Sequence, residues 1–138
     1  MNKTLFISLA ALSLSFAGSV LALDESAPIL CASVDVMECV DGGKCRTVLP
    51  EDVNAPTFFR LDLEKKQVTV SKDAGPNKAE NFAVLDGRIV MQGVDTGDDD
   101  ALDSVAWTIQ VEETTARMVA TAVLYQAAIV IFGACTEI

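Results

Sequence analysis

Apolar and polar residues alternate along most of this chain, and this period of two restricts its fold more than any other feature. Residues 104–111 read SVAWTIQV, so a large apolar side chain occupies every second position. Residues 59–64 (FRLDLE) and 67–71 (QVTVS) show the same pattern. Because successive side chains of a strand point to opposite faces, each segment is typical of a half-buried antiparallel β-strand.

Turn signals separate these segments. Asp86-Gly87 predicts a type I′ hairpin between residues 81–85 and 88–94, because both central residues of that turn need a positive φ. Residues 112–115 (EETT) predict another turn. From Cys31 onward we count about eight to nine short strands and no amphipathic helix of convincing length. We therefore expect an all-β, single-domain antiparallel β-meander that is closed into a small barrel or folded as a sandwich.

The C-terminal residues 118–135 (MVATAVLYQAAIVIFGAC) carry no charge, so a membrane helix has to be considered for them. Their β-branched residues and the polar Tyr125-Gln126 pair in the middle favour two buried strands that meet near Gln126. A buried or membrane-spanning helix is the alternative, since periodicity alone does not separate these structures. We expect no membrane span in the mature chain.

The N-terminal residues have the three parts of a secretory signal peptide. Lys3 provides the positive charge, residues 5–16 form the apolar segment, and Val20 and Ala22 provide small residues before a cleavage site. We therefore expect residues 1–22 to be a signal peptide cut after Ala22. Residues 23–138 would then be a secreted or periplasmic β-barrel-like domain.

The charge balance argues against nucleic acid as a partner. Removal of residues 1–22 takes only Lys3 from the ten basic residues, which leaves nine against 20 acidic ones. Such a surface repels phosphate backbones, and no cluster of Lys or Arg offsets this locally. The sequence does not identify a partner. A basic envelope protein or a small molecule would be compatible with it. Solubility alone would also explain the negative charge.

All four cysteines lie in the part expected to be exported: Cys31, Cys39, Cys45 and Cys135. An even number in an oxidising compartment predicts two disulfides, and four cysteines allow three pairings. Residues 41–43 (DGG) form a turn signal between Cys39 and Cys45, so a hairpin would place these two opposite each other. This favours a Cys39–Cys45 bridge and leaves Cys31–Cys135, which would tie the first strand to the last.

Residues 94–103 (VDTGDDDALD) are the sharpest acidic feature. Aspartates are hard oxygen ligands for Ca²⁺, but the spacing fails the EF-hand loop, which needs a Glu at its twelfth position. A solvated loop between strands is the simpler interpretation. The hypothesis of a weak Ca²⁺ site would use Asp95, Asp98, Asp99, Asp100 and Asp103.

Few residues suggest catalysis. The chain has no histidine, which removes Ser-His-Asp and Cys-His sites as well as histidine-ligated zinc. With 20 acidic residues a glycosidase-like carboxylate pair remains open, but no particular pair stands out. We expect no enzyme and no cofactor. Phe59 is expected on the core side of its strand, so its neighbours Phe58 and Arg60 point to the opposite face. They are therefore candidates for a contact surface.

Several landmarks together resemble a family of small secreted bacterial all-β proteins that is uncharacterised in activity. They are Glu38-Cys39, Gly42-Gly43-Lys44-Cys45, residues 50–63 (PEDVNAPTFFRLDL), residues 85–97 (LDGRIVMQGVDTG), Trp107 and residues 132–137 (FGACTE). The resemblance implies a secreted β-domain and no activity. The chain departs from it at residues 124–128 (LYQAA), where a polar, glycine-containing turn is expected. That segment would expose an apolar tip, and Tyr125 is therefore a third candidate for partner contact.

From the sequence we expect a non-catalytic binding or structural module. The chain is also similar in composition and expected architecture to small acidic periplasmic β-barrels that inhibit cationic lysozymes, although it lacks their Ser- and Lys-bearing inhibitory loop. Inhibition of a cationic envelope hydrolase is therefore one alternative. A Ca²⁺-assisted adhesion or stability factor that uses the acidic loop is the other.

Overall fold

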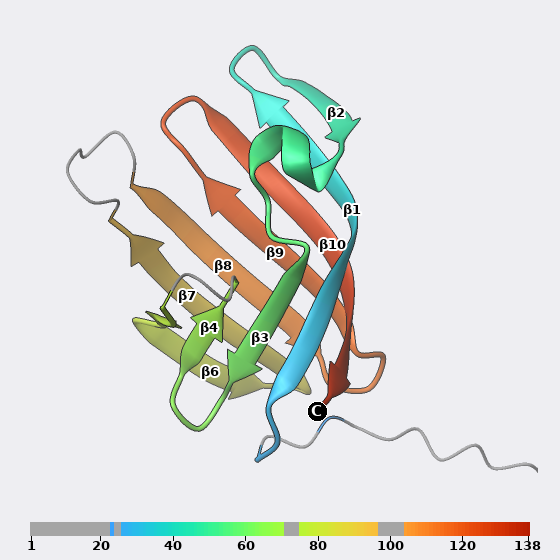
Figure 1. Cartoon of the computed structure of the whole chain (residues 1–138), viewed down its shortest axis with the longest axis vertical. Coiled ribbons are helices and arrows are strands. Elements are labelled where there is room, and N and C mark those ends of the chain that lie inside the picture. The colour runs from blue at the N-terminus through green and yellow to red at the C-terminus, as the bar shows by residue number, and fades with distance from the viewer. Residues whose placement is uncertain (1–22, 24–25, 71–74, 97–103) are drawn as a thin grey trace, which may run out of the picture.

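The computed structural model describes residue 23 and residues 26–70, 75–96 and 104–138 (Figure 1). The predicted signal peptide lies outside the described residues. One short 3₁₀ helix, η1 (Pro50–Val53), accompanies the strands. The strands are β1 (Ile29–Val40), β2 (Lys44–Val48), β3 (Phe58–Asp62), β4 (Gln67–Thr69), β5 (Asn77–Lys78), β6 (Asn81–Leu85), β7 (Arg88–Asp95), β8 (Val105–Glu112), β9 (Arg117–Val123) and β10 (Ala127–Glu137).

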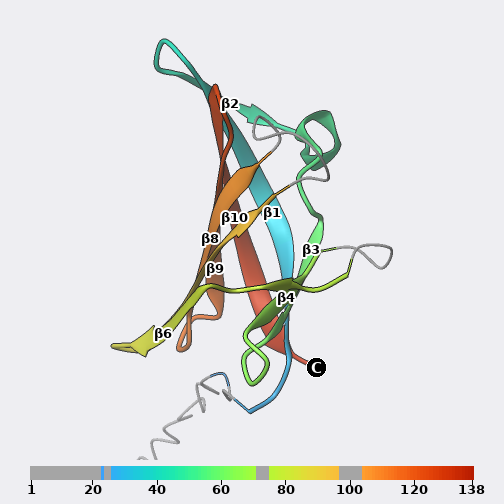
Figure 2. The ribbon, with the colours of Figure 1, turned by 90° about the vertical axis from the view of Figure 1, so that its left-hand side faces the viewer.

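All the strands belong to one antiparallel sheet in the order β5-β4-β3-β1-β10-β9-β8-β7-β6, with β2 paired to β1. The sheet curls strongly, so that β3 and β4 lie opposite β8 and β9, as in half of a barrel (Figure 2). We call the concave side of this curled sheet the hollow. The prediction of an all-β, disulfide-stapled antiparallel protein is confirmed. Strands β6 to β10 are a simple meander, whereas β1, the first strand, lies between β3 and the last strand, β10.

Strand β1 organises one side of the sheet because it is long enough to pair with two strands on the same edge. Its residues 29–32 pair with β3, and its residues 36–40 pair with β2. Its other edge pairs with β10, with a shift of register between Ser33 and Asp35. A β-bulge of this kind bends a strand and increases its twist, which helps the sheet to curl.

The core lies on the concave side of the sheet, where the alternating apolar residues meet. Its fully buried members come from opposite walls of the hollow and include Ile29, Leu61, Ile89, Met91, Val111 and Met118. In β3, Phe59 is 4% exposed and its neighbour Phe58 is 53% exposed, as the period of two predicts. Burying one such apolar side chain contributes about 1.5–3 kcal/mol, so the alternation itself selects the inner face.

The predicted turns are present where local signals are strong. Asp86 and Gly87 have φ of 51° and 72°, and Leu85 pairs with Arg88 across the β6–β7 turn. The uncharged C-terminal run forms β9 and β10, which meet at residues 124–126. The two-strand interpretation of this run is therefore confirmed, and the helix alternative is wrong. None of the helical segments among the described residues is long and apolar enough to cross a membrane.

The two ends of the sheet come together where the chain passes from β5 to β6. The backbone N–H of Ala79 donates to the carbonyl of Lys66, beside β4, over 2.8 Å. The next residue, Glu80, donates its N–H to the carbonyl of Gln92 in β7, also over 2.8 Å. The ammonium group of Lys66 lies 5.6 Å from the ring centre of Phe82 in β6. Main-chain hydrogen bonds thus join the two edges of the curled sheet at this point.

Both expected disulfides are present. Cys39 and Cys45 are partners in the β1–β2 hairpin, whose turn contains Gly42 and Gly43 at φ of 89° and 75°. Cys31 and Cys135 are partners across β1 and β10 and are separated by 104 residues in the sequence. All four thiols are therefore oxidised, and none is free as a nucleophile or metal ligand.

Candidate functional site

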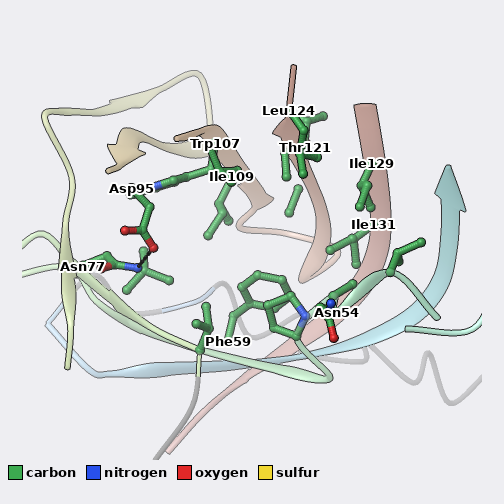
Figure 3. A pocket seen from close by; sticks show the side chains of 18 residues that line it. Asn54, Phe59, Asn77, Asp95, Trp107, Ile109, Thr121, Leu124, Ile129 and Ile131 are labelled. Carbon is green, nitrogen blue, oxygen red and sulfur yellow. Dashed lines mark hydrogen bonds between the residues drawn. The ribbon is translucent and has the colours of Figure 1, made fainter. Parts of the chain in front are cut away.

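The hollow of the half-barrel contains a cavity of about 330 Å³. Phe59 and Asn54 lie on one side of it, and Trp107, Ile109 and Ile131 lie on the other (Figure 3). Fourteen of its 18 lining residues are apolar, and the exceptions are Asn54, Asn77, Asp95 and Thr121. A largely apolar hollow with a few polar groups is the usual form of a small-molecule site, and this volume lies near the small end of the usual range.

Small side chains on β9 create the space. The inward positions of this strand are Met118, Ala120 and Ala122, so side-chain size falls from the buried core toward the cavity. Ala120 is 3% exposed and Ala122 packs against the core, yet neither reaches across to β3. An eight-stranded barrel of ordinary size is filled by its own side chains unless small residues leave room for a ligand.

The connection between η1 and β3 forms part of the cavity wall and is fixed by β1. The N–H groups of Asn54 and Ala55 both donate to the carbonyl of Pro50, and Asn54 adopts the left-handed conformation that ends η1. The hydroxyl of Ser33 donates to the carbonyl of Pro56 over 2.6 Å, and the N–H of Ser33 donates to the carbonyl of Thr57 over 2.9 Å. The shift of register in β1 thus provides the groups that hold this wall.

Trp107 belongs to the opposite wall of the cavity. It pairs with Gly93 across β8 and β7, and its indole lies over that glycine. A Cβ at position 93 would stand 2.5 Å from Cζ2 and 2.8 Å from Cε2 of the indole, so only glycine permits this packing. The indole Nε1 is buried and has no hydrogen-bond partner. Among the described residues it is the one buried side-chain polar atom left without a partner.

Asp95 lies two residues beyond Gly93 on β7 and therefore on the same inner face. Its Oδ2 accepts a 3.4 Å hydrogen bond from Nδ2 of Asn77 in β5, which links the two ends of the sheet at the cavity (Figure 3). The other residues of the Ca²⁺ hypothesis, Asp98, Asp99, Asp100 and Asp103, lie outside the described residues. Within the described part of the chain, no three His, Cys, Asp or Glu side chains converge on a metal position.

The three candidates for partner contact are exposed but do not form one surface. Phe58 pairs with Ala32 at the start of β1, and Arg60 follows it on the same outer face. Tyr125 is 76% exposed in the β9–β10 turn, whose Gln126 carbonyl accepts from the N–H of Asp41. Ala32, beside Phe58, and Asp41, beside the β9–β10 turn, are nine residues apart along the extended chain, which corresponds to about 30 Å. The role of the three candidates in binding stays a prediction.

Sequence reasoning placed Trp107 on the apolar face of its strand and did not identify the cavity. One local signal was available, since Gly93 interrupts an otherwise apolar strand pattern, and an interior glycine often marks a close approach of another group. Which residue approaches depends on the register between β7 and β8, and the sequence does not state it. The role of Asn77 was not predictable, because its hydrogen bond to Asp95 depends on how the two edges of the sheet approach each other.

Comparisons with known proteins yield no relative for this chain. No protein-family model matches it, and no curated protein or solved structure is significantly similar to it. The resemblance to a secreted bacterial family therefore stays a prediction.

Proposed function

We propose that this protein is an exported, non-catalytic binding module whose half-barrel cavity holds one small, mainly apolar molecule. The observation that carries the proposal is the cavity of about 330 Å³, with apolar walls contributed by both halves of the curled sheet. A ligand in this cavity would pack against the apolar side chains that line it and would remove their surface from water. The small side chains of Ala120 and Ala122 leave room for such a ligand.

Two disulfides support export, since such bonds form and persist in oxidising compartments. Residues 1–22 would direct the export. We include no catalytic step because the chain has no histidine and the cavity wall offers a single carboxylate, Asp95. A lone carboxylate beside an amide is a poor basis for acid–base chemistry, whereas it suffices for orienting a ligand.

Filling the cavity tests the proposal directly. The mature protein is titrated with Nile red, a neutral apolar dye whose emission rises in apolar surroundings. We expect saturable 1:1 binding to the unmodified protein and a loss of at least about tenfold in affinity for Ala120→Leu, whose longer side chain enters the hollow. Ala106→Leu is the matched control, because Ala106 lies on β8 with its side chain on the exposed outer face.

Equal affinity of the dye for Ala120→Leu and Ala106→Leu would place binding outside the cavity and reject the proposal. If the dye affinity falls for Ala120→Leu alone, mass spectrometry of organic extracts from protein purified from its native compartment would identify the natural ligand. The hydrolase-inhibitor alternative predicts salt-sensitive, stoichiometric loss of lysozyme activity, which neither leucine variant should alter. The Ca²⁺ alternative predicts a rise in Tm with Ca²⁺ that chelator reverses.

A further inference from the structure

The charge at one side of the cavity indicates which ligands it selects, and this inference rests on the proposed binding function. Asp95 is the one charged residue among the 18 that line the cavity. No Lys or Arg belongs to this lining, so the wall itself does not neutralise the carboxylate. A cationic group on the ligand would provide the missing opposite charge.

Asn77 holds this carboxylate and adds a second oxygen beside it. Its Nδ2 donates to Oδ2 of Asp95 over 3.4 Å, and the two side chains lie together at one side of the cavity in Figure 3. Because an amide donates through its nitrogen, Oδ1 of Asn77 keeps its capacity to accept, as does Oδ1 of Asp95. Two such oxygens suit a group that only donates hydrogen bonds. A protonated amine is a group of this kind.

The rest of the lining indicates the other end of the ligand. Phe59, Ile109 and Ala120 are buried, whereas Asp95 is exposed. The cavity therefore runs from a buried apolar part to an exposed, negatively charged edge. An amine at that edge stays in contact with water, which avoids the large cost of moving a charge into apolar surroundings. The hydrocarbon part of the same molecule leaves water, and this transfer favours binding.

The net charge of the protein acts in the same direction at longer range. The whole chain carries a formal charge of −10, which attracts cations and repels anions around the entire surface. This general field and the local pairing with Asp95 are separable by experiment. Removal of a carboxylate far from the cavity changes the net charge equally and leaves the lining intact.

We propose that the cavity selects a compact apolar molecule that carries one protonated amine, and that this amine binds the carboxylate of Asp95 at the exposed edge. The apolar body of the ligand contacts Phe59, Ile109 and Ile131 in the buried part. Anions of the same shape are rejected, because Asp95 repels them and no lining residue offers a positive charge.

Three compounds of nearly the same shape test the proposal: 2-(aminomethyl)naphthalene, 2-ethylnaphthalene and 2-naphthoate. The first is a cation at neutral pH, the second has a methyl group in place of the ammonium group, and the third is an anion. Their affinities are measured by displacement of Nile red. The deciding quantity is how the amine-to-ethyl affinity ratio changes between protein variants, because the ammonium and methyl groups differ in their own cost of dehydration.

Asp95→Asn removes the charge and keeps the shape of the side chain. We expect it to lower the amine-to-ethyl affinity ratio about fivefold, which is typical of an ion pair that water still reaches. The affinities of 2-ethylnaphthalene and Nile red should not change, and this result would show that the variant is folded with its cavity intact. In the unmodified protein, 2-naphthoate should bind at least about tenfold more weakly than the amine.

Asp86→Asn is the matched control. Asp86 lies in the β6–β7 turn, at the other end of β7 from Asp95 and outside the cavity lining. Its φ of 51° suits asparagine, so the turn should persist. This variant loses the same charge from the molecule and none from the cavity. We expect it to leave the amine-to-ethyl affinity ratio within about twofold of that of the unmodified protein.

The outcomes separate this inference from the proposed function. If Nile red and 2-ethylnaphthalene bind in the cavity but the affinity ratio is equal in all three proteins, or falls equally in both variants, the binding function stands and the role of Asp95 is wrong. Binding of 2-naphthoate as tight as that of the amine would also overturn the selection of cations. If none of the three compounds binds and Nile red does not bind either, the proposed function fails and takes this inference with it.

Discussion

At the scale of single residues, Gly93 and Trp107 fix each other across β7 and β8. We predict that Gly93→Ala destabilises the protein by about 1–3 kcal/mol, because the new Cβ would stand 2.5 Å from Cζ2 of the indole. Urea unfolding measures this loss. Gly75→Ala is the control, since no heavy atom lies within 4 Å of a Cβ built there, and it should be neutral or slightly stabilising.

The same clash should also make the effects of substitutions at positions 93 and 107 on the free energy of unfolding non-additive. Because Trp107 is the ring that the new methyl group meets, Gly93→Ala should lose much of its effect in the Trp107→Phe background, where a smaller ring occupies the space. Additive losses in the double variant would contradict the packing that we infer between these two residues.

Asp62 illustrates a residue-scale effect that depends on pH. The side chain of Lys65 donates to its Oδ2 over 2.8 Å, and the backbone N–H of Lys65 donates to Oδ1 over 2.9 Å. These hydrogen bonds hold the pKa of Asp62 below its ordinary value of 3.8. The ionised form is therefore favoured in the folded protein. Its contribution is present above pH 3.8 and is lost as the pH falls through the lowered pKa.

We predict that Asp62→Asn has a slightly lower Tm than the unmodified protein at pH 7, and that the two values converge as the pH falls below 3.8. The difference is small because this turn is exposed to solvent. Thermal unfolding between pH 7 and pH 2 measures it. Lys65→Met, which keeps the backbone hydrogen bond, should show a weaker form of the same convergence. A Tm gap that persists at pH 2 would refute the assignment.

At the scale of elements, the wall formed by the η1–β3 connection depends on its contact with β1. We predict that Ser33→Ala costs about 1 kcal/mol, because the carbonyl of Pro56 loses its 2.6 Å hydrogen bond. It should also weaken Nile red binding several-fold, since this wall lines the cavity.

Thr115→Ala is a matched control for that experiment. It removes another 2.6 Å hydroxyl hydrogen bond, the one to Oε2 of Glu112 in the β8–β9 turn, away from the cavity lining. We expect it to leave dye affinity unchanged. Equal weakening by both substitutions would mean that the wall is not a specific support for the site.

The sequence predicts elements well where the signal is local. Asp86-Gly87 specifies its turn through the positive φ of both residues, and Phe59 alternates with Phe58 over adjacent positions. The double pairing of β1 was not predictable, because it depends on which strands share an edge with residues 29–32 and 36–40. The cavity escaped prediction for a similar reason. An alanine at position 120 is simply an apolar residue until its neighbours across the hollow are known.

At the scale of the whole molecule, two disulfides act over very different lengths of chain. Cys39 and Cys45 close a segment with a sequence separation of 6, inside one hairpin whose strands are already adjacent. Cys31 and Cys135 close nearly the whole domain, with a separation of 104. A cross-link restricts the unfolded chain more when it closes a longer loop, so the two bonds should differ in their effect on stability.

This difference gives the last prediction. In the chain-entropy account, replacing Cys31 and Cys135 with alanine lowers the free energy of unfolding by roughly 4–5 kcal/mol, against roughly 2 kcal/mol for the Cys39 and Cys45 pair. Urea unfolding of the two double variants without reductant, compared with the unmodified protein with both bonds intact, measures both losses. Only the first pair joins β1 to β10, which carries Ile129 and Ile131 into the cavity wall. We therefore expect Nile red affinity to fall in that variant alone. Equal losses of stability would mean that the unfolded chain keeps β1 and β10 close together without the bond. Strand pairing, and not the Cys31–Cys135 bond, would then hold β1 against β10.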